Sequence, residues 1–351
     1  MVDQSTRLAI YMEGAILGPA GKMGFGVLRY SRNPITCVVD SQTKGRDLKD
    51  LTGINRFCPI VESVEDAITM GAQVLILGIA PPGGLIPESW WPVVDRAVEA
   101  GMSIVNGLHD LISPRFPNLP REPQPDGSQF IWDIRVEPKG IGPGSGAAAE
   151  QTNRRLLLIG TDMAVGKMTA GLEIEREASL RGIRTAFVAT GQIGITITGS
   201  GIPLDAIRVD FASGAVQKEV LRYSQEGAEL VIVEGQGSLI HPGSTANLPL
   251  LRGACPTDLV LCHRAGQEHL VHLPAVKVPP LKEFIQMYED LAEACGTFPR
   301  PKTRCVSLNT AHLFEVEANE ACKAIEDDLG IPCADPIRHG AGKLVDSIWG
   351  S

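Results

Sequence analysis

The sequence predicts an α/β protein of two doubly wound domains, each with a parallel sheet covered by helices. Three observations lead to this prediction. Short apolar runs rich in Val and Ile alternate with amphipathic stretches along most of the chain. A segment rich in Gly, Pro, Ser and Ala interrupts the alternation at residues 138–153. The 351 residues exceed what one hydrophobic core usually holds, and they suit two domains joined by that segment.

The first domain is predicted over residues 1–137. Its expected strands are "LAIYMEG", "ITCVVD", "QVLILGIA", "MSIVNGL" and "FIWDIRV". Apolar residues recur at helical spacing between them, as in "VESVEDAITMGA", so helices should connect parallel strands. The first strand leads into "GAILGPAGKMGFG" and the second ends at Asp40, which outlines a Rossmann-like domain. These glycines do not follow the G-x-G-x-x-G spacing, so NAD is only weakly indicated and glycines that shape a loop are the simpler interpretation.

The second domain is predicted over residues 154–351, after a linker at 138–153. The alternation restarts with "RLLLIG" and continues through "TAFVATG", "AELVIVEG", "TDLVLCH" and "TRCVSLNT". Each run is short and bounded by glycine or polar residues, as the strands of a buried parallel sheet are. This half is therefore expected to be a second doubly wound domain.

Composition narrows the classes of function. The formal net charge is −9 and no run of Lys or Arg offers a local exception, so no nucleic-acid partner is expected. No stretch reaches the roughly 18 apolar residues that a membrane span needs, and the N-terminus lacks the pattern of a signal peptide. The eight cysteines form no C-x-x-C pair and fit reduced thiols. A cytoplasmic protein without a membrane partner is expected, and a homo-oligomer stays open.

The stretch "GTDMAVGK", residues 160–167, is predicted to be a phosphate-binding loop. It leads from the strand "LLLIG" into the helical stretch "MTAGLEIEREASLRG". In that context backbone N–H groups face an anion and Lys167 adds a positive charge. A glycine-rich turn with a solvated lysine is the simpler alternative. The residues expected to hold phosphates are Gly160, Thr161, Asp162, Val165, Gly166, Lys167, Met168 and Thr169.

The loop departs from the usual pattern G-x-x-x-x-G-K-[ST] in two ways. Gly160 sits one residue early, with Thr161 in its slot. Met168 follows the lysine where a serine or threonine hydroxyl normally binds Mg²⁺. Thr169 is one residue further on, which is about 100° further round a helix of 3.6 residues per turn. The loop keeps the features that hold phosphates and lacks one that binds Mg²⁺.

Three motifs resemble the dethiobiotin synthetase branch of P-loop proteins. "GTDMAVGK" is similar to the G-T-D-T-x-V-G-K signature of that branch. "AELVIVEGQGSL" is similar to its V-E-G-A-G segment, which implies Mg²⁺ binding by Glu234. "RCVSLNT" places Asn309 at a strand end, where those enzymes have an adenine-reading asparagine. The lysine that they carry after the next strand is missing, since "FVATGQIG" offers Thr190 and Gln192. The resemblance implies a P-loop NTPase-like fold.

A second resemblance spans nearly the whole chain. The motifs "APPGG", "GLHD", "GTDMAVGKMT", "ATGQIGI", "DFASGA", "EGQGSLIHPG", "LVLCH" and "ADP" fall in the order seen in a two-domain bacterial family that includes the D-glutamate N-acetyltransferases (DgcN-like proteins). The chain is identified as a member of that family, which implies a Rossmann-like N-terminal half and a P-loop C-terminal half. The resemblance also implies transfer of acetyl from acetyl-CoA to the amine of D-glutamate or a similar small acidic amino acid.

Two ligands fit the predicted loop. Acetyl-CoA carries a pyrophosphate and a 3′-phosphate, so the loop could clamp the coenzyme with no nucleotide hydrolysis. Alternatively, ATP binds there and recruits Mg²⁺ through Glu234 and Asp210, as in an ATP-dependent carboxylate ligase or kinase. A third interpretation is a non-catalytic protein that senses a nucleotide or CoA.

Further candidates lie at expected strand ends, where open α/β domains bind ligands. His241, in "GSLIHPGS", and Glu234 are the candidates for the base that takes the amine proton. Asp210 is a candidate for the substrate or metal region, with helix capping as an equal alternative. His109 and Asp110 of "GLHD" are candidates for the same substrate or metal region.

The cluster "CHRAGQEHLVH", residues 262–272, contains three histidines and a cysteine that could bind a metal. Its spacing matches no established zinc pattern, so no metal site is assigned. Arg264 in this cluster could instead help to hold a phosphate or a carboxylate.

Overall fold

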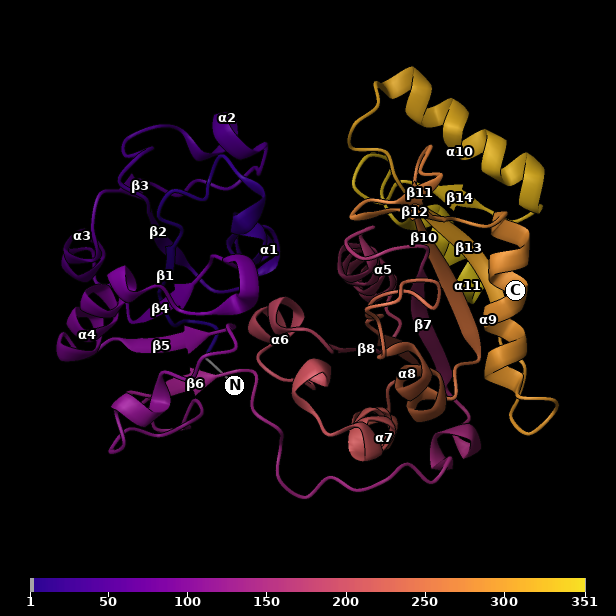
Figure 1. Cartoon of the computed structure of the whole chain (residues 1–351), viewed down its shortest axis with the longest axis horizontal. Coiled ribbons are helices and arrows are strands. Elements are labelled where there is room, and N and C mark those ends of the chain that lie inside the picture. Colours follow the sequence, from indigo (N-terminus) through magenta and orange to yellow (C-terminus); the bar gives the residue numbers. More distant parts are fainter. Residues whose placement is uncertain (1–2, 351) are drawn as a thin grey trace. The chain divides into compact units, whose positions relative to one another are not determined.

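The computed structural model describes residues 3–350, which fold into two compact units. The first unit comprises residues 3–136 and a returning segment, residues 192–206. The second unit comprises residues 137–191 and 207–350. Each unit is built on a six-stranded sheet (Figure 1), and the pairings recorded in both six-stranded sheets are all parallel. The predicted class, two parallel α/β domains, is confirmed.

The first sheet has the strand order β3-β2-β1-β4-β5-β6, the order of dinucleotide-binding domains. Its strands are β1 (Leu8–Tyr11), β2 (Ile35–Val39), β3 (Ile60–Val61), β4 (Val74–Leu77), β5 (Ser103–Asn106) and β6 (Ile131–Asp133). The α-helices of this unit are α1 (Lys22–Tyr30), α2 (Leu48–Thr52), α3 (Val64–Thr69), α4 (Trp91–Glu99) and α6 (Gln192–Thr198). The central strands β1, β4 and β5 are buried along their whole length, which explains why they appear in the sequence as unbroken apolar runs.

Small residues let α1 approach this sheet closely. A Cβ atom added at Gly78 would lie 3.0 Å from the Cα atom of Gly24, and the N–H of Gly24 donates to the carbonyl of Gly78 at 2.8 Å. On the opposite face, α3 and α4 pack in a core that includes Tyr11, Val64 and Val94. Gly24, one of the glycines that follow β1, therefore lets α1 pack closely against the end of β4.

The returning segment, residues 192–206, belongs to the first unit although it follows β8 in the chain. Its helix α6 packs against α1, and its Asp205 forms an ion pair with Arg135 at 3.3 Å. Ile195 and Ile202 are buried. The prediction from sequence assigned these residues to the domain that starts at residue 154. A segment that leaves one domain between two strands and packs on another has no distinctive composition, so the sequence alone does not reveal it.

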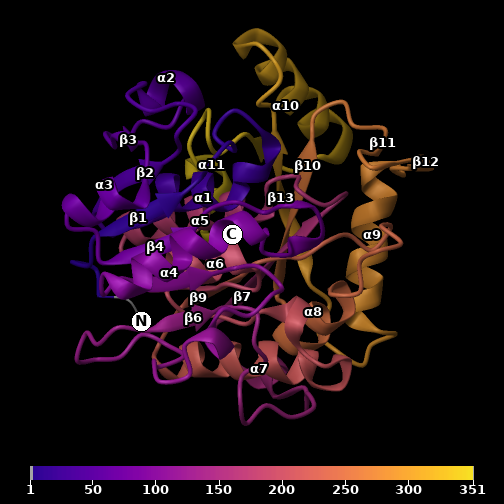
Figure 2. The ribbon, with the colours of Figure 1, turned by 60° about the vertical axis from the view of Figure 1, so that its left-hand side comes forward.

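The second sheet has the strand order β14-β13-β10-β7-β9-β8. Its strands are β7 (Arg154–Gly160), β8 (Thr185–Val188), β9 (Leu230–Val233), β10 (Asp258–Arg264), β13 (Lys302–Asn309) and β14 (Cys333–Ala334), and β11 (His269–Leu270) and β12 (Leu273–Lys277) form a separate antiparallel hairpin. The helices are α5 (Lys167–Leu180), α7 (Val209–Gln225), α8 (Asn247–Ala254), α9 (Leu281–Glu293), α10 (Glu315–Leu329) and α11 (Gly342–Trp349). Helices α5 and α11 pack together against the sheet, and α7 and α8 form a second packed pair, as Figures 1 and 2 show.

Most of the segment predicted as a linker, residues 138–153, packs along α7 of the second unit. The side-chain oxygen of Gln217 accepts hydrogen bonds from the N–H groups of Ser145 and Ala147, both at 3.1 Å. The side-chain amide nitrogen of Gln217 donates to the hydroxyl of Ser145 at 3.0 Å. A composition rich in Gly and Pro thus marks an irregular but docked segment in this chain.

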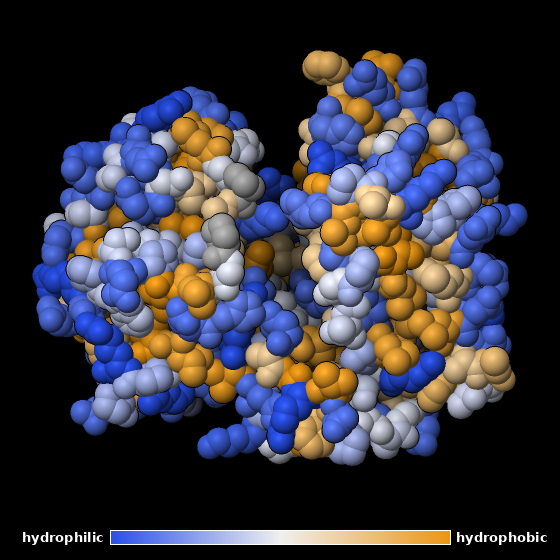
Figure 3. Space-filling view, in the orientation of Figure 1, coloured by the Kyte–Doolittle hydropathy of each residue, from blue (hydrophilic) through white to orange (hydrophobic). Residues whose placement is uncertain are grey.

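The surface of each unit carries both hydrophilic and apolar residues. Hydrophilic residues cover much of the face in Figure 3, and apolar residues interrupt them in several places. Leu17, Phe57 and Val209 are among the large apolar side chains that are mostly exposed. Within residues 3–350, no helix has both the length and the apolar character needed to cross a bilayer.

Replacing Gly214 of α7 by alanine is expected to dislodge the docked segment. The new Cβ atom would lie 1.8 Å from the carbonyl oxygen of Gly142, so backbone must shift, at a cost of roughly 1–3 kcal/mol. Gly142→Ala is the matched control on the other side of the same contact, because a Cβ atom there meets nothing within 4 Å. Thermal unfolding should show a clear loss for Gly214→Ala alone. Equal melting temperatures for the two variants would contradict this packing.

Candidate functional site

The phosphate loop, residues 161–166, joins the buried strand β7 to α5. Gly166 has a φ of 108° and Ala164 a φ of 55°, so two residues of the loop adopt the left-handed region. Alternation of such residues turns successive N–H groups toward one concave side, which is the geometry of an anion nest. Gly160 is required for space, since a Cβ atom there would lie 2.9 Å from Nζ of Lys167. The predicted strand, loop and helix are all present.

Lys167 is buried beneath this loop. Only 6% of the residue is exposed, and Nζ donates a hydrogen bond to the carbonyl oxygen of Asp162 at 2.8 Å. Burial lowers the pKa of Lys167 to about 8, because the ammonium group loses hydration in the interior. An anion bound in the loop would stabilise this charge. The alternative of a solvated lysine is therefore wrong.

The carboxylate of Asp162 holds the chain that follows β10 through hydrogen bonds. One oxygen accepts from the N–H of Met163 at 2.6 Å. The other accepts from Nε2 of Gln267 at 2.7 Å and from the N–H of Val271 at 2.9 Å. Asp162 was predicted as a cofactor-binding residue, and its side chain instead ties the phosphate loop to the β11–β12 hairpin. Gln267, which lies 105 residues further along the chain, was not among the predicted site residues.

Thr161 and His263 form a buried pair beside the loop. Oγ1 of Thr161 lies 2.9 Å from Nδ1 of His263, and the two residues are 0% and 6% exposed. Burial lowers the pKa of His263 to about 4, so the ring is neutral at pH 7. Thr161, in the slot of the missing glycine, thus uses its hydroxyl to anchor the loop to β10. Among the described residues, no three side chains of His, Cys, Asp or Glu come together as a metal site.

Glu234 follows β9, the strand next to β7, and shares the buried region of Lys167. Its Oε2 atom accepts from the N–H groups of Thr190 at 2.8 Å and Gly191 at 3.2 Å. Burial raises the pKa of Glu234 to about 7, partly opposed by these hydrogen bonds and by the charge of Lys167. Gly235 brings the chain against β7, since a Cβ atom there would lie 1.7 Å from the carbonyl oxygen of Leu158. A carboxylate that titrates near neutral pH therefore stands beside the phosphate loop.

Three further predicted residues of the second unit have different surroundings. Nδ1 of His241 accepts a hydrogen bond from the N–H of Gly243 at 3.1 Å, so the lone pair that a base would use is engaged in its own turn. Asp210 lies exposed in the first turn of α7. Asn309 lies half-buried at the end of β13, where its side-chain oxygen accepts from the N–H of Ala311 at 3.1 Å. Within residues 3–350, the side-chain amide nitrogen of Asn309 makes no hydrogen bond.

Met168 and Thr169 lie half-buried in the first turn of α5. A thioether is a poor ligand for Mg²⁺, which prefers oxygen. Among the residues predicted for Mg²⁺, Glu234 keeps one carboxylate oxygen that engages no hydrogen bond recorded within residues 3–350. The donor set at the loop is therefore one hydroxyl short of the usual Mg²⁺ site of a P-loop protein.

The candidates in the first unit stabilise its own loops. Oδ2 of Asp110 accepts from the N–H of Ile86 at 2.7 Å, and the exposed ring of His109 lies against Arg135. The carboxylate of Asp40, where dinucleotide-binding domains hold a ribose, accepts from the N–H of Gly14 at 2.9 Å and from Thr43. Its hydrogen bonds are thus made within the domain.

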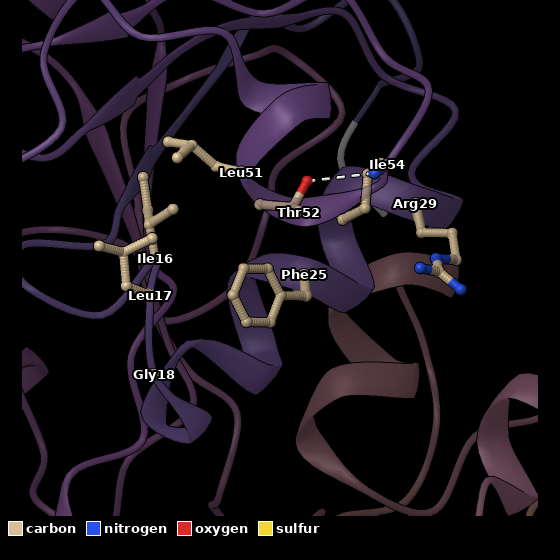
Figure 4. A pocket seen from close by; sticks show the side chains of 8 residues that line it. All are labelled: Ile16, Leu17, Gly18, Phe25, Arg29, Leu51, Thr52 and Ile54. Carbon is tan, nitrogen blue, oxygen red and sulfur yellow. Dashed lines mark hydrogen bonds between the residues drawn. The ribbon is translucent and has the colours of Figure 1, made fainter. Parts of the chain in front are cut away.

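The first unit also contains a cavity of about 370 Å³ between the β1–α1 loop, α1 and α2 (Figure 4). It is lined by Ile16, Leu17, Gly18, Phe25, Arg29, Leu51, Thr52 and Ile54. Arg29 supplies its only charge, and the hydroxyl of Thr52 is engaged by the N–H of Ile54 at 3.1 Å. Polar and apolar atoms line the cavity about equally, so its lining does not indicate one class of ligand.

Comparison with known proteins finds the same two domains. Residues 142–345 match a family model described as a domain of unknown function, DUF1611, P-loop domain, and residues 41–137 match its Rossmann-like N-terminal domain. A D-glutamate N-acetyltransferase from Tritonibacter scottomollicae is 37% identical over 82% of this chain and 84% of its own. A second, from a Pseudoalteromonas species, is 36% identical over 85% and 86%.

A crystal structure extends the comparison to the full length. A DUF1611 family protein from Anabaena variabilis is 46% identical, with a TM-score of 0.92 over 99% of this chain and 100% of that chain. The resemblance inferred from the motifs is confirmed by these matches. The chain therefore belongs to the DUF1611 family, with a Rossmann-like N-terminal domain and a P-loop C-terminal domain.

Proposed function

We propose that this chain transfers the acetyl group of acetyl-CoA to the amine of a small acidic amino acid, of which D-glutamate is the model. The observation that carries the proposal is the phosphate loop itself, where buried Lys167 is followed by Met168. Such a loop suits a pyrophosphate that is held and not cleaved, because holding needs N–H groups and a cation, whereas cleavage also needs a well-placed Mg²⁺. The names of the two relatives supply the acceptor class.

The reaction needs a nucleophilic amine and a leaving thiolate. A base removes a proton from the substrate ammonium group, and the neutral amine attacks the thioester carbonyl carbon. The carbon–nitrogen bond forms, the carbon–sulfur bond breaks, and CoA leaves as a thiolate that takes up a proton. Glu234 is the better candidate for the base, since its pKa of about 7 lies near neutrality and one of its carboxylate oxygens accepts no hydrogen bond within residues 3–350. His241 is weaker, because Nδ1 is engaged by Gly243.

A competing function is an ATP- and Mg²⁺-dependent ligase or kinase that acts on a carboxylate. The observation in its favour is Glu234, which matches the Mg²⁺-binding glutamate of the dethiobiotin synthetase branch. Within residues 3–350, one of its carboxylate oxygens accepts no hydrogen bond and is available to a metal ion. Against it stands Met168 in place of the hydroxyl. A non-catalytic sensor of CoA or nucleotide would use the same loop and would show no turnover.

Thiol release from acetyl-CoA tests the proposal directly. With D-glutamate and no added Mg²⁺, wild type should release CoA thiol and form N-acetylglutamate in equal amounts. Lys167→Ala should raise the KM for acetyl-CoA by roughly 10- to 100-fold, because a charge-assisted contact to phosphate is lost. Arg184→Ala, which removes an exposed cation at the start of β8, serves as the control. Absence of thiol release with any D- or L-amino dicarboxylate, alongside turnover with ATP and Mg²⁺, would move the assignment to the ligase.

The pH profile of kcat/KM separates the two candidate bases. Glu234 must be ionised to act, so the rate should rise as pH increases through about 7. Lys167 loses its charge above a pH of about 8, so coenzyme binding should weaken there and the profile should fall. Glu234→Gln should abolish the acidic limb and lower kcat by roughly 10²- to 10⁴-fold. His241→Ala should keep that limb; its disappearance in this variant would identify His241 as the base instead.

A further inference from the structure

Three neighbouring strands of the second sheet end side by side at the phosphate loop. In the β7–β10 pair, Gly160 is the partner of Cys262, and in the β10–β13 pair, Arg264 is the partner of Asn309. The carboxyl edge of the sheet therefore presents the loop, Arg264 and Asn309 in that order. Adjacent strands are about 4.8 Å apart, so Arg264 stands midway across a span of roughly 10 Å between the loop and Asn309.

Side-chain alternation places Arg264 on the face of the sheet that carries Lys167. A Cβ atom at Gly160 would lie 2.9 Å from Nζ of Lys167, so Gly160 and its strand partner Cys262 point to the face that carries Lys167. Ser307 on β13 is the partner of Cys262 on that face. The pairing is regular from Val260 onward, and side chains two residues apart on a strand share a face. Arg264 and Asn309 lie two residues beyond Cys262 and Ser307 on their strands, so their side chains lie on the same face.

The donors of Arg264 are available at this edge. The residue is exposed, and within residues 3–350 no hydrogen bond or ion pair engages its guanidinium group. Nδ2 of Asn309 is likewise unengaged, while its Oδ1 accepts from Ala311. A guanidinium group with five donors in a planar fork binds phosphate in a bidentate manner. Nδ2 of Asn309 is thus placed to donate a hydrogen bond to an acceptor nitrogen of a base such as adenine.

We propose that Arg264 binds the 3′-phosphate of coenzyme A and thereby selects CoA over ATP. This inference rests on the proposed function and names the residue that decides its coenzyme. In CoA the phosphorylated ribose links the pyrophosphate to the adenine, so a ligand with its pyrophosphate in the loop and its adenine at Asn309 carries the 3′-phosphate across β10. ATP has a free 3′-hydroxyl, which gives a guanidinium group no anion to bind.

Calorimetric titration with CoA and with 3′-dephospho-CoA tests the inference, since the two ligands differ only in that phosphate. Wild type should bind CoA about 10- to 100-fold more tightly than 3′-dephospho-CoA, which is the effect expected of one charge-assisted phosphate contact. Arg264→Gln should bind both ligands equally, with the wild-type affinity for 3′-dephospho-CoA. Arg184→Gln, an exposed arginine at the opposite edge of the same sheet, should keep the wild-type preference.

The remaining outcomes separate a failure of the Arg264 assignment from a failure of the proposed function. Equal binding of both ligands by wild type, with both lost in Lys167→Ala, would overturn the role of Arg264 and leave the coenzyme site in place. A parallel loss of both affinities in Arg264→Gln, with an unchanged melting temperature, would assign Arg264 to another part of the coenzyme. Failure of wild type to bind either ligand would remove the proposed function as well.

Discussion

The ammonium group of Lys167 is a positive charge inside the interior of the second domain, and the surrounding residues are arranged to hold it there. Gly160 and Gly235 leave room for its side chain against β7, and the carbonyl of Asp162 accepts its hydrogen bond. Burial lowers the pKa of Lys167 to about 8 and raises that of Glu234 to about 7, so both groups titrate near neutral pH. A bound phosphate is the ligand that would stabilise such a charge most directly.

Contacts between strands distant in sequence hold the loop in shape. Thr161 is joined to His263 on β10, and Asp162 is joined to the chain beyond β10 through Gln267. Both links are made by side chains of the loop. Within residues 3–350, the N–H groups of Ala164, Val165 and Gly166 and the N-terminus of α5 remain for a ligand, whereas those of Thr161 and Met163 are engaged inside the protein. This arrangement agrees with a rigid clamp for a pyrophosphate.

The local parts of this site could be predicted from the sequence, and the long-range parts could not. Strand, loop and helix around Lys167 follow from hydrophobic pattern and glycine spacing, and Glu234 from a motif at the end of the next apolar run. The partners of Thr161 and Asp162 lie more than 100 residues away, so no spacing rule could find them. The return of residues 192–206 to the first domain and the docking of residues 138–153 by Gln217 also depend on tertiary packing, which composition does not record.

Binding of coenzyme phosphates by the phosphate loop without a metal ion is the property on which the proposed function depends. Its most direct test is calorimetric titration of the wild-type protein with acetyl-CoA and, separately, with ATP, each in the presence of Mg²⁺ and of a chelator. Acetyl-CoA is expected to bind with the same affinity in both conditions and more tightly than ATP. Binding of ATP that requires Mg²⁺, with no heat of binding from acetyl-CoA, would contradict it.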